Sequence, residues 1–370
     1  MTVCKSCLRH SHLIAHLAPR IAGLLDRPRP RPASILDLGE HALIETVAGP
    51  EREAAAFAFL EQFDADAALE ALIESDLEAI CRHAAQYPEG LRQLTDAPRV
   101  LYCTASPDRL GELLAEPTVT VVGTRKPSPY GSEVARELGR GLAAVGVTVI
   151  SGLALGVDAL AHEGALAGKG RPIAVLACGA NLAYPARHRP LYRRVRETGV
   201  VLSELPPGCR PFRWSFPARN RIMAALGAIT VVVEAADPSG TLITAAFAAD
   251  LGRTVGAVPG HVTSWRADGN NRLLREGAAT IRGTKDVLDE IYGVGNTPTY
   301  LIDAASSHAL SLEPRLRAVL DGVEMGETLG EIAARTGMSA GAVRSALGEL
   351  EVAGLIVSGA LGWYQRVARR

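Results

Sequence analysis

The chain has 370 residues, which exceeds one ordinary domain and predicts two or three. Hydrophobic residues make up 48% and charged residues 21%, a balance that excludes extensive disorder. The formal net charge of −1 excludes a polycation that holds nucleic acid by bulk charge, although it is compatible with a local basic face. No apolar run approaches the roughly 18 residues of a membrane span, and the N-terminus lacks an export signal. We therefore expect a cytoplasmic protein with reduced cysteines and no membrane span.

Residues 1–95 predict a small helical domain, of the SAM or helix-hairpin-helix type. Residues 54–85 are alanine-rich, and their apolar positions recur at three- and four-residue spacing, which indicates helix. The sequence Tyr-Pro-Glu-Gly at 87–90 ends this stretch. A short strand is expected over residues 100–103.

The pattern changes over residues 96–292, where short β-branched runs alternate with helical stretches. Apolar runs without polar alternation are typical of strands buried on both faces, and helices between them give right-handed crossovers. These features predict an α/β fold with a doubly wound, Rossmann-like parallel sheet. The expected strands are 119–123, 147–151, 173–178, 200–204, 229–235 and 255–260, and the expected helices are 130–145, 157–167 and 242–251.

A small-residue linker is predicted over residues 293–310, followed by a winged-helix domain over 311–370. This last segment balances seven arginines with seven acidic residues, and its third helix offers only Arg344 to a DNA groove. An electrostatically neutral module is a poor duplex binder, so a transcriptional regulator is the less favoured alternative. The predicted helices are 314–320, 329–336 and one capped by Ser339 that runs to 353, with a turn at Gly337 and a wing formed by 355–359 and the segment around Trp363.

Three turns that follow predicted strands carry the residue types of a phosphate site. Ligands of open α/β sheets bind at the carboxyl ends of strands, where helix N-termini offer free N–H groups. Glycine permits close backbone approach, and the planar fork of arginine suits phosphate oxygens, although a loop arginine can also form only a salt bridge. The P-loop and GxGxxG motifs are absent, so neither ATP nor NAD is expected as a cofactor. The predicted phosphate-binding residues in these turns are Gly123, Thr124, Arg125, Ser151, Gly152, Ser239, Gly240 and Thr241.

Residues 181–221 are strongly basic, with nine arginines against two acidic residues. Arginine pairs with phosphate, and aromatic rings stack on bases without reading sequence. The alternative is that the aromatic side chains fill the core while the arginines tie loops together. We favour binding, and we assign it to Arg219, Asn220 and Arg221, preceded by the aromatic residues Phe212, Trp214 and Phe216.

The motifs VVGTRKPSPYG, SGLALGVDALAHEGAL, SELPPG, FPARNRI, VVVEAADPSGTLITA, GRTVGAVPG and DGNNRLLREGA follow one another in order. In this they resemble the DNA-processing protein A (DprA, also called Smf) family, over roughly residues 87–290. The resemblance implies a protein without catalytic turnover that binds single-stranded DNA, protects incoming DNA during natural transformation and loads the RecA recombinase. It also implies a homodimer through the α/β domain. One departure is Leu155, where the family often has an arginine, so one DNA anchor is in question.

An enzyme alternative is a nucleotide phosphoribohydrolase of the lysine-decarboxylase-like type. The motif PGGxGTxxE is typical of that family, and in it an acidic residue follows the glycines by one helical turn. The corresponding run here, residues 238–245, has no carboxylate in the first turn. We therefore do not favour catalysis.

The pair Cys4 and Cys7, with His10, His12 and His16 nearby, has the ligand types of a zinc site. A second, properly spaced pair of ligands is lacking in the surrounding sequence. The sequence therefore favours packing over a metal, and no metal or other cofactor is expected. His162 is likewise interpreted as a structural residue that bonds a backbone carbonyl.

Overall fold

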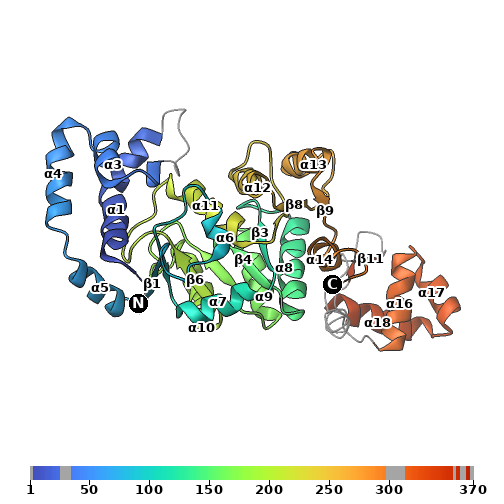
Figure 1. Cartoon of the computed structure of the whole chain (residues 1–370). Coiled ribbons are helices and arrows are strands. Elements are labelled where there is room, and N and C mark those ends of the chain that lie inside the picture. The colour runs from blue at the N-terminus through green and yellow to red at the C-terminus, as the bar shows by residue number, and fades with distance from the viewer. Residues whose placement is uncertain (1–2, 26–34, 297–312, 353–355, 359–363, 367–370) are drawn as a thin grey trace. The chain divides into compact units, whose positions relative to one another are not determined.

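A computed structural model describes residues 3–25, 35–296, 313–352, 356–358 and 364–366 (Figure 1). The chain divides into two compact units, Met1–Pro298 and Thr299–Arg370, and each is described by itself. Among the described residues, no helix is long and apolar enough to cross a membrane.

One nine-stranded sheet forms the centre of the larger unit, in the order β1-β2-β6-β5-β4-β3-β7-β8-β9. Strands β3 to β9 are parallel, whereas β2 pairs antiparallel with β6, and β1 pairs antiparallel with β2. The six strands predicted for the α/β region and the short strand predicted over residues 100–103 are all confirmed. The strands are β1 (Glu78–Cys81), β2 (Val100–Cys103), β3 (Thr118–Val122), β4 (Thr148–Ser151), β5 (Ile173–Val175), β6 (Val200–Ser203), β7 (Ile229–Val232), β8 (Thr254–Ala257) and β9 (Ala279–Thr280).

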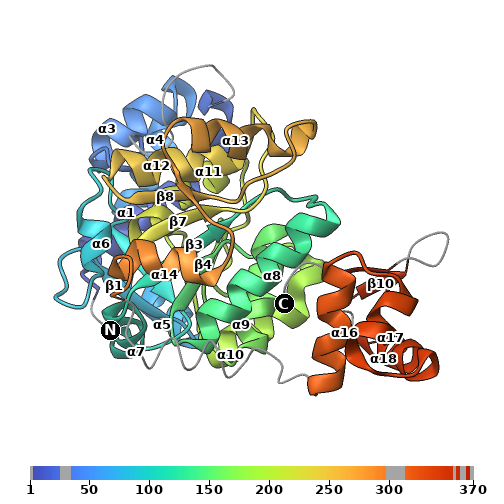
Figure 2. The same ribbon diagram turned by 90° about the vertical axis from the view of Figure 1, so that its right-hand side faces the viewer.

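Helices cover both faces of this sheet (Figure 2). Helices α8 (Pro129–Ala144), α9 (Val157–Ala167) and α10 (Arg189–Thr198) pack in a row on one face, and α11 (Ser215–Leu226) and α12 (Gly240–Asp250) pack together on the other. Strand β3 is buried along its whole length, because it lies between these two layers. Its Thr120 hydroxyl donates to the Met223 carbonyl of α11 at 2.8 Å, which satisfies a buried polar group. The predicted doubly wound α/β fold is confirmed.

Shorter helices complete the covering of the sheet. They are α6 (Glu89–Arg92), α7 (Pro107–Ala115), α13 (Asp268–Arg275) and α14 (Thr284–Tyr292), with single 3₁₀ turns at Ala186–His188 and Trp265–Ala267.

Four helices precede the sheet: α1 (Lys5–Leu25), α3 (Glu40–Val47), α4 (Pro50–Glu61) and α5 (Ala65–Glu74). The apolar faces of α1, α3 and α4 form a core that includes Trp214, whose indole N–H donates to the Ala18 carbonyl at 3.0 Å, whereas Ala68 and Leu72 of α5 pack in a separate cluster. Trp214 therefore joins these helices to the α/β part of the chain, in agreement with the core-filling alternative for the aromatic segment.

The helix predicted over residues 54–85 is divided into α4 and α5, and the prediction is wrong beyond Glu74. The Asp64 side chain accepts the N–H groups of Asp66 and Ala67 and so starts a new helix, α5. Residues 78–81 then form the edge strand β1, in which Ile80 is fully buried. The sheet consequently begins inside the helical domain that the sequence predicted.

The smaller unit has the predicted winged-helix elements. Helices α16 (Pro314–Glu324), α17 (Leu329–Thr336) and α18 (Ala340–Val352) enclose an apolar core, and β10 (Ile356–Ser358) pairs antiparallel with β11 (Tyr364–Arg366). The turn glycine Gly337 has a φ of 69°, and the Ser339 hydroxyl accepts the Ala342 N–H at 3.2 Å. Most of the predicted linker, residues 297–310, lies outside the described residues.

Candidate functional site

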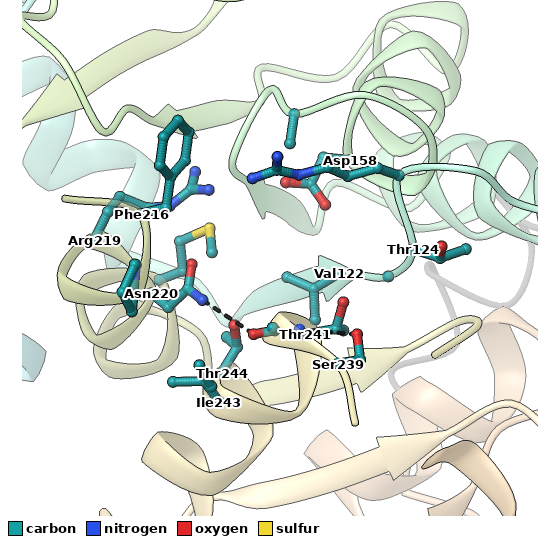
Figure 3. Close-up of a pocket in the computed structure, with 16 residues that line it drawn as sticks. Val122, Thr124, Asp158, Phe216, Arg219, Asn220, Ser239, Thr241, Ile243 and Thr244 are labelled. Carbon is teal, nitrogen blue, oxygen red and sulfur yellow. Dashed lines mark hydrogen bonds between the residues drawn. The ribbon is translucent and has the colours of Figure 1, made fainter. Parts of the chain in front are cut away.

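The strand order places a crevice at the carboxyl ends of β3 and β7. From β3 the chain winds outward through β4, β5 and β6, and then returns to the opposite side of β3 to form β7. The loops that follow β3 and β7 diverge at such a switch point, which is where open α/β sheets bind ligands. A pocket of about 300 Å³ occupies this position (Figure 3). Its lining combines the turn after β3, the first turns of α11 and the N-terminus of α12.

The turn after β3 is held in place by the end of β7. The Thr124 N–H donates to the Glu234 carbonyl at 2.7 Å, and the Glu234 carboxylate accepts the Ser128 N–H at 2.7 Å. A Cβ atom at Gly123 would collide with Val157 of α9, so only glycine permits this close approach. The backbone that carries Arg125 is therefore fixed by the end of β7 and by the start of α9.

Arg125 is exposed and lies over an aromatic ring. Its guanidinium carbon is 5.1 Å from the ring centroid of Phe216, within the range of a cation–π contact. The Tyr184 ring lies 5.9 Å from that of Phe216 and is tilted by 51°. Tyr184 is 43% exposed. The three side chains thus form an accessible row that offers one cation and two π-faces, which we call the Arg125–Phe216–Tyr184 row.

Arg219 is buried beneath this row. Its guanidinium donates to the Val175 carbonyl and packs directly on Gly152, where a Cβ atom would collide with it. The buried carboxylate of Asp158 accepts the Gly152 N–H at 3.1 Å. Burial raises the pKa of Asp158, and the positive charge of Arg219 opposes that increase. Burial likewise lowers the pKa of Arg219, and the negative charge of Asp158 opposes that decrease.

The N-terminus of α12 forms the opposite wall of the pocket. The Ser239 hydroxyl caps this helix by accepting the Thr241 N–H at 3.2 Å. The Asn220 side chain donates to the Gly240 carbonyl at 3.4 Å and so ties α11 to this turn (Figure 3). The helix dipole adds positive potential where Arg125 and Arg219 already supply it.

Eight of the eleven predicted binding residues line this pocket, and Gly152 lines a smaller adjoining cavity of about 60 Å³. The structure does not bring the other two to it. The Ser151 hydroxyl is buried and donates to the Val121 carbonyl at 2.6 Å, which ties β4 to β3. Arg221 is fully buried and paired with Asp96 and Glu204. The residues brought together are Gly123, Thr124, Arg125, Arg219, Asn220, Ser239, Gly240 and Thr241.

Sequence reasoning did not assign several lining residues. Tyr184 lines the smaller cavity, and Ile243 and Thr244 complete the α12 wall of the pocket. The helical spacing from Gly240 is the signal that points to Ile243, because residues three apart share a helix face. Leu155, where an arginine is frequent in the resembling family, lines the smaller cavity.

His162 of α9 is fully buried near the site. Burial lowers the pKa of its imidazole from 6.5 to about 3. Because the folded pKa is depressed, the stability linked to this group is present above pH 6.5 and is lost as the pH falls from 6.5 toward 3. Over this window, wild type should lose about 1.4 kcal/mol per pH unit more than His162→Gln. Urea titrations at several pH values measure this, and parallel curves for the two proteins would contradict it.

Known proteins are similar to this chain over most of its length. A family model described as DNA recombination-mediator protein A matches residues 78–292, and a DprA winged helix domain model matches residues 306–360. Protein Smf of Synechocystis sp. is 32% identical over 345 residues, which cover 85% of this chain and 84% of that protein.

Two solved structures are also similar. DNA processing protein A (DprA) from Streptococcus pneumoniae is 31% identical, with a TM-score of 0.61 over 78% of this chain and 99% of that chain. DNA processing protein A from Helicobacter pylori is 29% identical, with a TM-score of 0.52 over 58% of this chain and 95% of that chain. The latter structure is reported for its "unique single-stranded DNA binding mode".

The fold and pocket define a Rossmann-like α/β protein with a cationic site at its switch point and a winged-helix module after it. The family model covers more than half of the chain, and the Synechocystis relative is matched over most of its length. The chain therefore belongs to the DNA recombination-mediator protein A family, also called DprA or Smf, whose members are DNA processing proteins.

Proposed function

We propose that this protein binds single-stranded DNA at the switch-point pocket and that it acts as a recombination mediator through this binding. The observation that carries the proposal is the Arg125–Phe216–Tyr184 row, which stands beside the N-terminus of α12. A phosphate would accept hydrogen bonds from Arg125 and the turn, while a neighbouring base stacks on an exposed ring. The single-stranded DNA binding reported for the Helicobacter pylori relative supports this assignment.

Single strands fit this site better than a duplex does. Stacking on Phe216 or Tyr184 needs an unpaired base, because a base inside a duplex has no free face. The winged helix does not supply an alternative duplex reader, because its charges balance and Arg315 and Arg335 form ion pairs with Glu349 and Glu327. A protein-contact or accessory role for that unit agrees with its neutrality.

A binding assay across a salt series tests the proposal. We expect single-stranded oligonucleotides to bind more tightly than duplexes of the same length, with little dependence on sequence. The logarithm of the affinity should fall with the logarithm of salt, with a slope of about −0.7 per phosphate neutralised. Equal or tighter duplex binding at moderate salt, or a flat salt response, would contradict the assignment.

We also propose that the pocket carries out no catalytic turnover. A phosphoribohydrolase needs a carboxylate one turn into the helix that follows the glycines, and the first turn of α12 consists of Gly240, Thr241, Leu242 and Ile243. The nearest acidic residue in the lining, Asp158, is buried against Arg219 and hydrogen-bonded to the backbone. Incubation with nucleoside monophosphates and chromatography of the products tests this, and base release that depends on the pocket residues would overturn it.

The RecA-loading step and the homodimer are proposed on the family relationship. We expect purified protein at tens of micromolar to scatter light with twice the mass of one chain. The α/β unit alone, ending before Thr299, should do the same, because the dimer is expected through that unit. A monomeric mass for the full chain would refute the dimer. Acceleration of RecA filament growth on single strands by the added protein tests the loading role.

A further inference from the structure

Three cysteines and one histidine from distant parts of the sequence lie close together in the larger unit. They are Cys4, Cys7, Cys81 and His83, and their ligand atoms all lie within 4.8 Å of one another. Two come from the start of α1 and two from the end of β1. None of them lines the switch-point pocket.

From this cluster we propose that the protein holds a structural Zn²⁺ ion on these three cysteines and one histidine. Zinc in structural sites is four-coordinate and tetrahedral, and Cys₃His is one of its usual ligand sets. Thiolate and imidazole ligands also select against the hard ions Mg²⁺ and Ca²⁺.

The spacing of the ligand atoms agrees with a tetrahedral ion. The His83 Nδ1 atom lies 3.6 Å from the Cys4 Sγ atom and 3.5 Å from the Cys7 Sγ atom. Zinc bonds of about 2.3 Å to sulfur and 2.0–2.1 Å to nitrogen place such atoms about 3.6 Å apart at the tetrahedral angle. A disulfide would use only two of the three thiols, and all three are free.

Local structure presents each pair of ligands in a fixed geometry. The Cys4 carbonyl accepts the Leu8 N–H at 3.1 Å at the start of α1, and residues three apart share a helix face, so both sulfurs point the same way. On the other side, the Ala84 N–H donates to the Cys81 carbonyl at 2.9 Å, which closes a tight turn around His83. Arg92 donates to the carbonyl groups of residues 82 and 84 at 2.8 Å and 2.6 Å and stabilises this turn.

The burial of the ligands suits a structural ion with an entry route. Cys7 and Cys81 are 2% and 3% exposed, whereas His83 is exposed and faces solvent. An ion here would tie α1 to the edge strand of the sheet. Because the unfolded chain lacks the assembled ligands, metal binding would contribute directly to the stability of this junction.

The histidines near Cys4 in the sequence are engaged elsewhere. His10 is buried with its Nε2 atom 3.2 Å from the Leu36 carbonyl, and the Nδ1 atom of His12 lies 2.9 Å from the Leu8 carbonyl. His16 stacks on Phe59. The other two ligands are instead a Cys-x-His pair at the end of β1, which has no conventional zinc spacing and lies far from Cys7 in the sequence.

Metal analysis of the full-length, tag-free chain purified with zinc in the medium tests the site. We expect about one zinc per chain after gel filtration. Replacement of the ion with Co²⁺ should give thiolate charge-transfer bands and the strong visible absorption of a tetrahedral ion. Wild-type protein with neither bound zinc nor a tetrahedral Co²⁺ spectrum would overturn the proposal.

Matched variants identify the ligands. His83→Ala changes an exposed residue and should lower the zinc content at least tenfold, and Cys4→Ser should do the same. His16→Ala and Cys209→Ser change a histidine and a cysteine outside the cluster and should keep the full content. Chelation should lower the melting temperature of wild type but not of His83→Ala, with recovery on adding zinc. Full zinc content in both ligand variants, or its loss in both controls, would also overturn the assignment.

Discussion

Replacing Arg125 with alanine should weaken single-stranded DNA binding roughly ten- to a hundredfold. The change removes a charge-assisted, fork-shaped contact worth about 1.5–3 kcal/mol when it is desolvated in a complex. It should leave folding nearly unchanged, because the side chain is exposed and its contact is with the partly exposed ring of Phe216. Arg125→Lys should recover only part of the loss, since an ammonium group cannot make two parallel bonds to a phosphate.

The controls for Arg125 are arginines on other surfaces. Arg136 lies further along α8 and pairs with Glu163 at 3.6 Å, so Arg136→Ala removes the same charge outside the pocket. Arg344→Ala removes it from the winged helix. Both should keep the affinity within about threefold of wild type, because neither residue lines the pocket and an exposed charge outside the contact contributes little. DNA binding by all variants is compared at one salt concentration, after a thermal melting curve has shown that each variant is folded. If Arg125→Ala binds like wild type while Arg344→Ala does not, the DNA site lies on the C-terminal unit.

Replacing Arg221 with alanine should instead destabilise the larger unit by about 3–5 kcal/mol. The side chain is 1% exposed, and it lies 2.7 Å from a Glu204 oxygen and 3.2 Å from an Asp96 oxygen. Its removal leaves a Glu204 side chain that is only 10% exposed without its counter-charge. Urea unfolding of the purified chain measures the loss, and the fraction that stays folded should bind DNA within about threefold of wild type.

A second variant separates the lost ion pair from lost packing. Arg221→Met with Glu204→Gln keeps most of the volume and removes the charges of Arg221 and of its more buried partner, so it should be more stable than Arg221→Ala. Arg210, an exposed arginine of the same basic segment, should shift the free energy of unfolding by less than about 0.5 kcal/mol when it is changed to alanine. A wild-type urea midpoint for Arg221→Ala would show that the buried pair does not stabilise the fold.

The contrast between Arg219 and Arg221 marks the limit of prediction from the sequence. Two residues apart on a helix, their side chains point about 200° apart, so only one of them can face the pocket. Both arginines follow the same basic, aromatic segment, and the local sequence does not indicate which of them faces the pocket. The partners that decide it, Asp96 and Glu204, approach α11 only in the folded sheet.

The elements that could be predicted are those whose state is set locally. The bounds of α9 match at both ends, and the apolar runs of the parallel strands have no competing helical pattern. Strand β1 could not be predicted, because its residues continue an alanine-rich helical pattern and become a strand only by pairing with β2. For the same reason the sequence points to Cys4 and Cys7 but not to Cys81 and His83, which meet them only after that pairing.

The position of β3 in the sheet has a consequence for how the protein is made. Val119 pairs with Val149 on one side and with Ile229 on the other, so one wall of the pocket is synthesised long before the other. As the chain leaves the ribosome, β3 to β6 can assemble while β7 and α12 are still untranslated. A nascent or truncated chain of that length holds Arg125 but has no opposite wall. Nascent chains and degradation fragments that end before β7 should therefore not bind DNA. Binding should begin only when the chain is long enough to add β7 and α12.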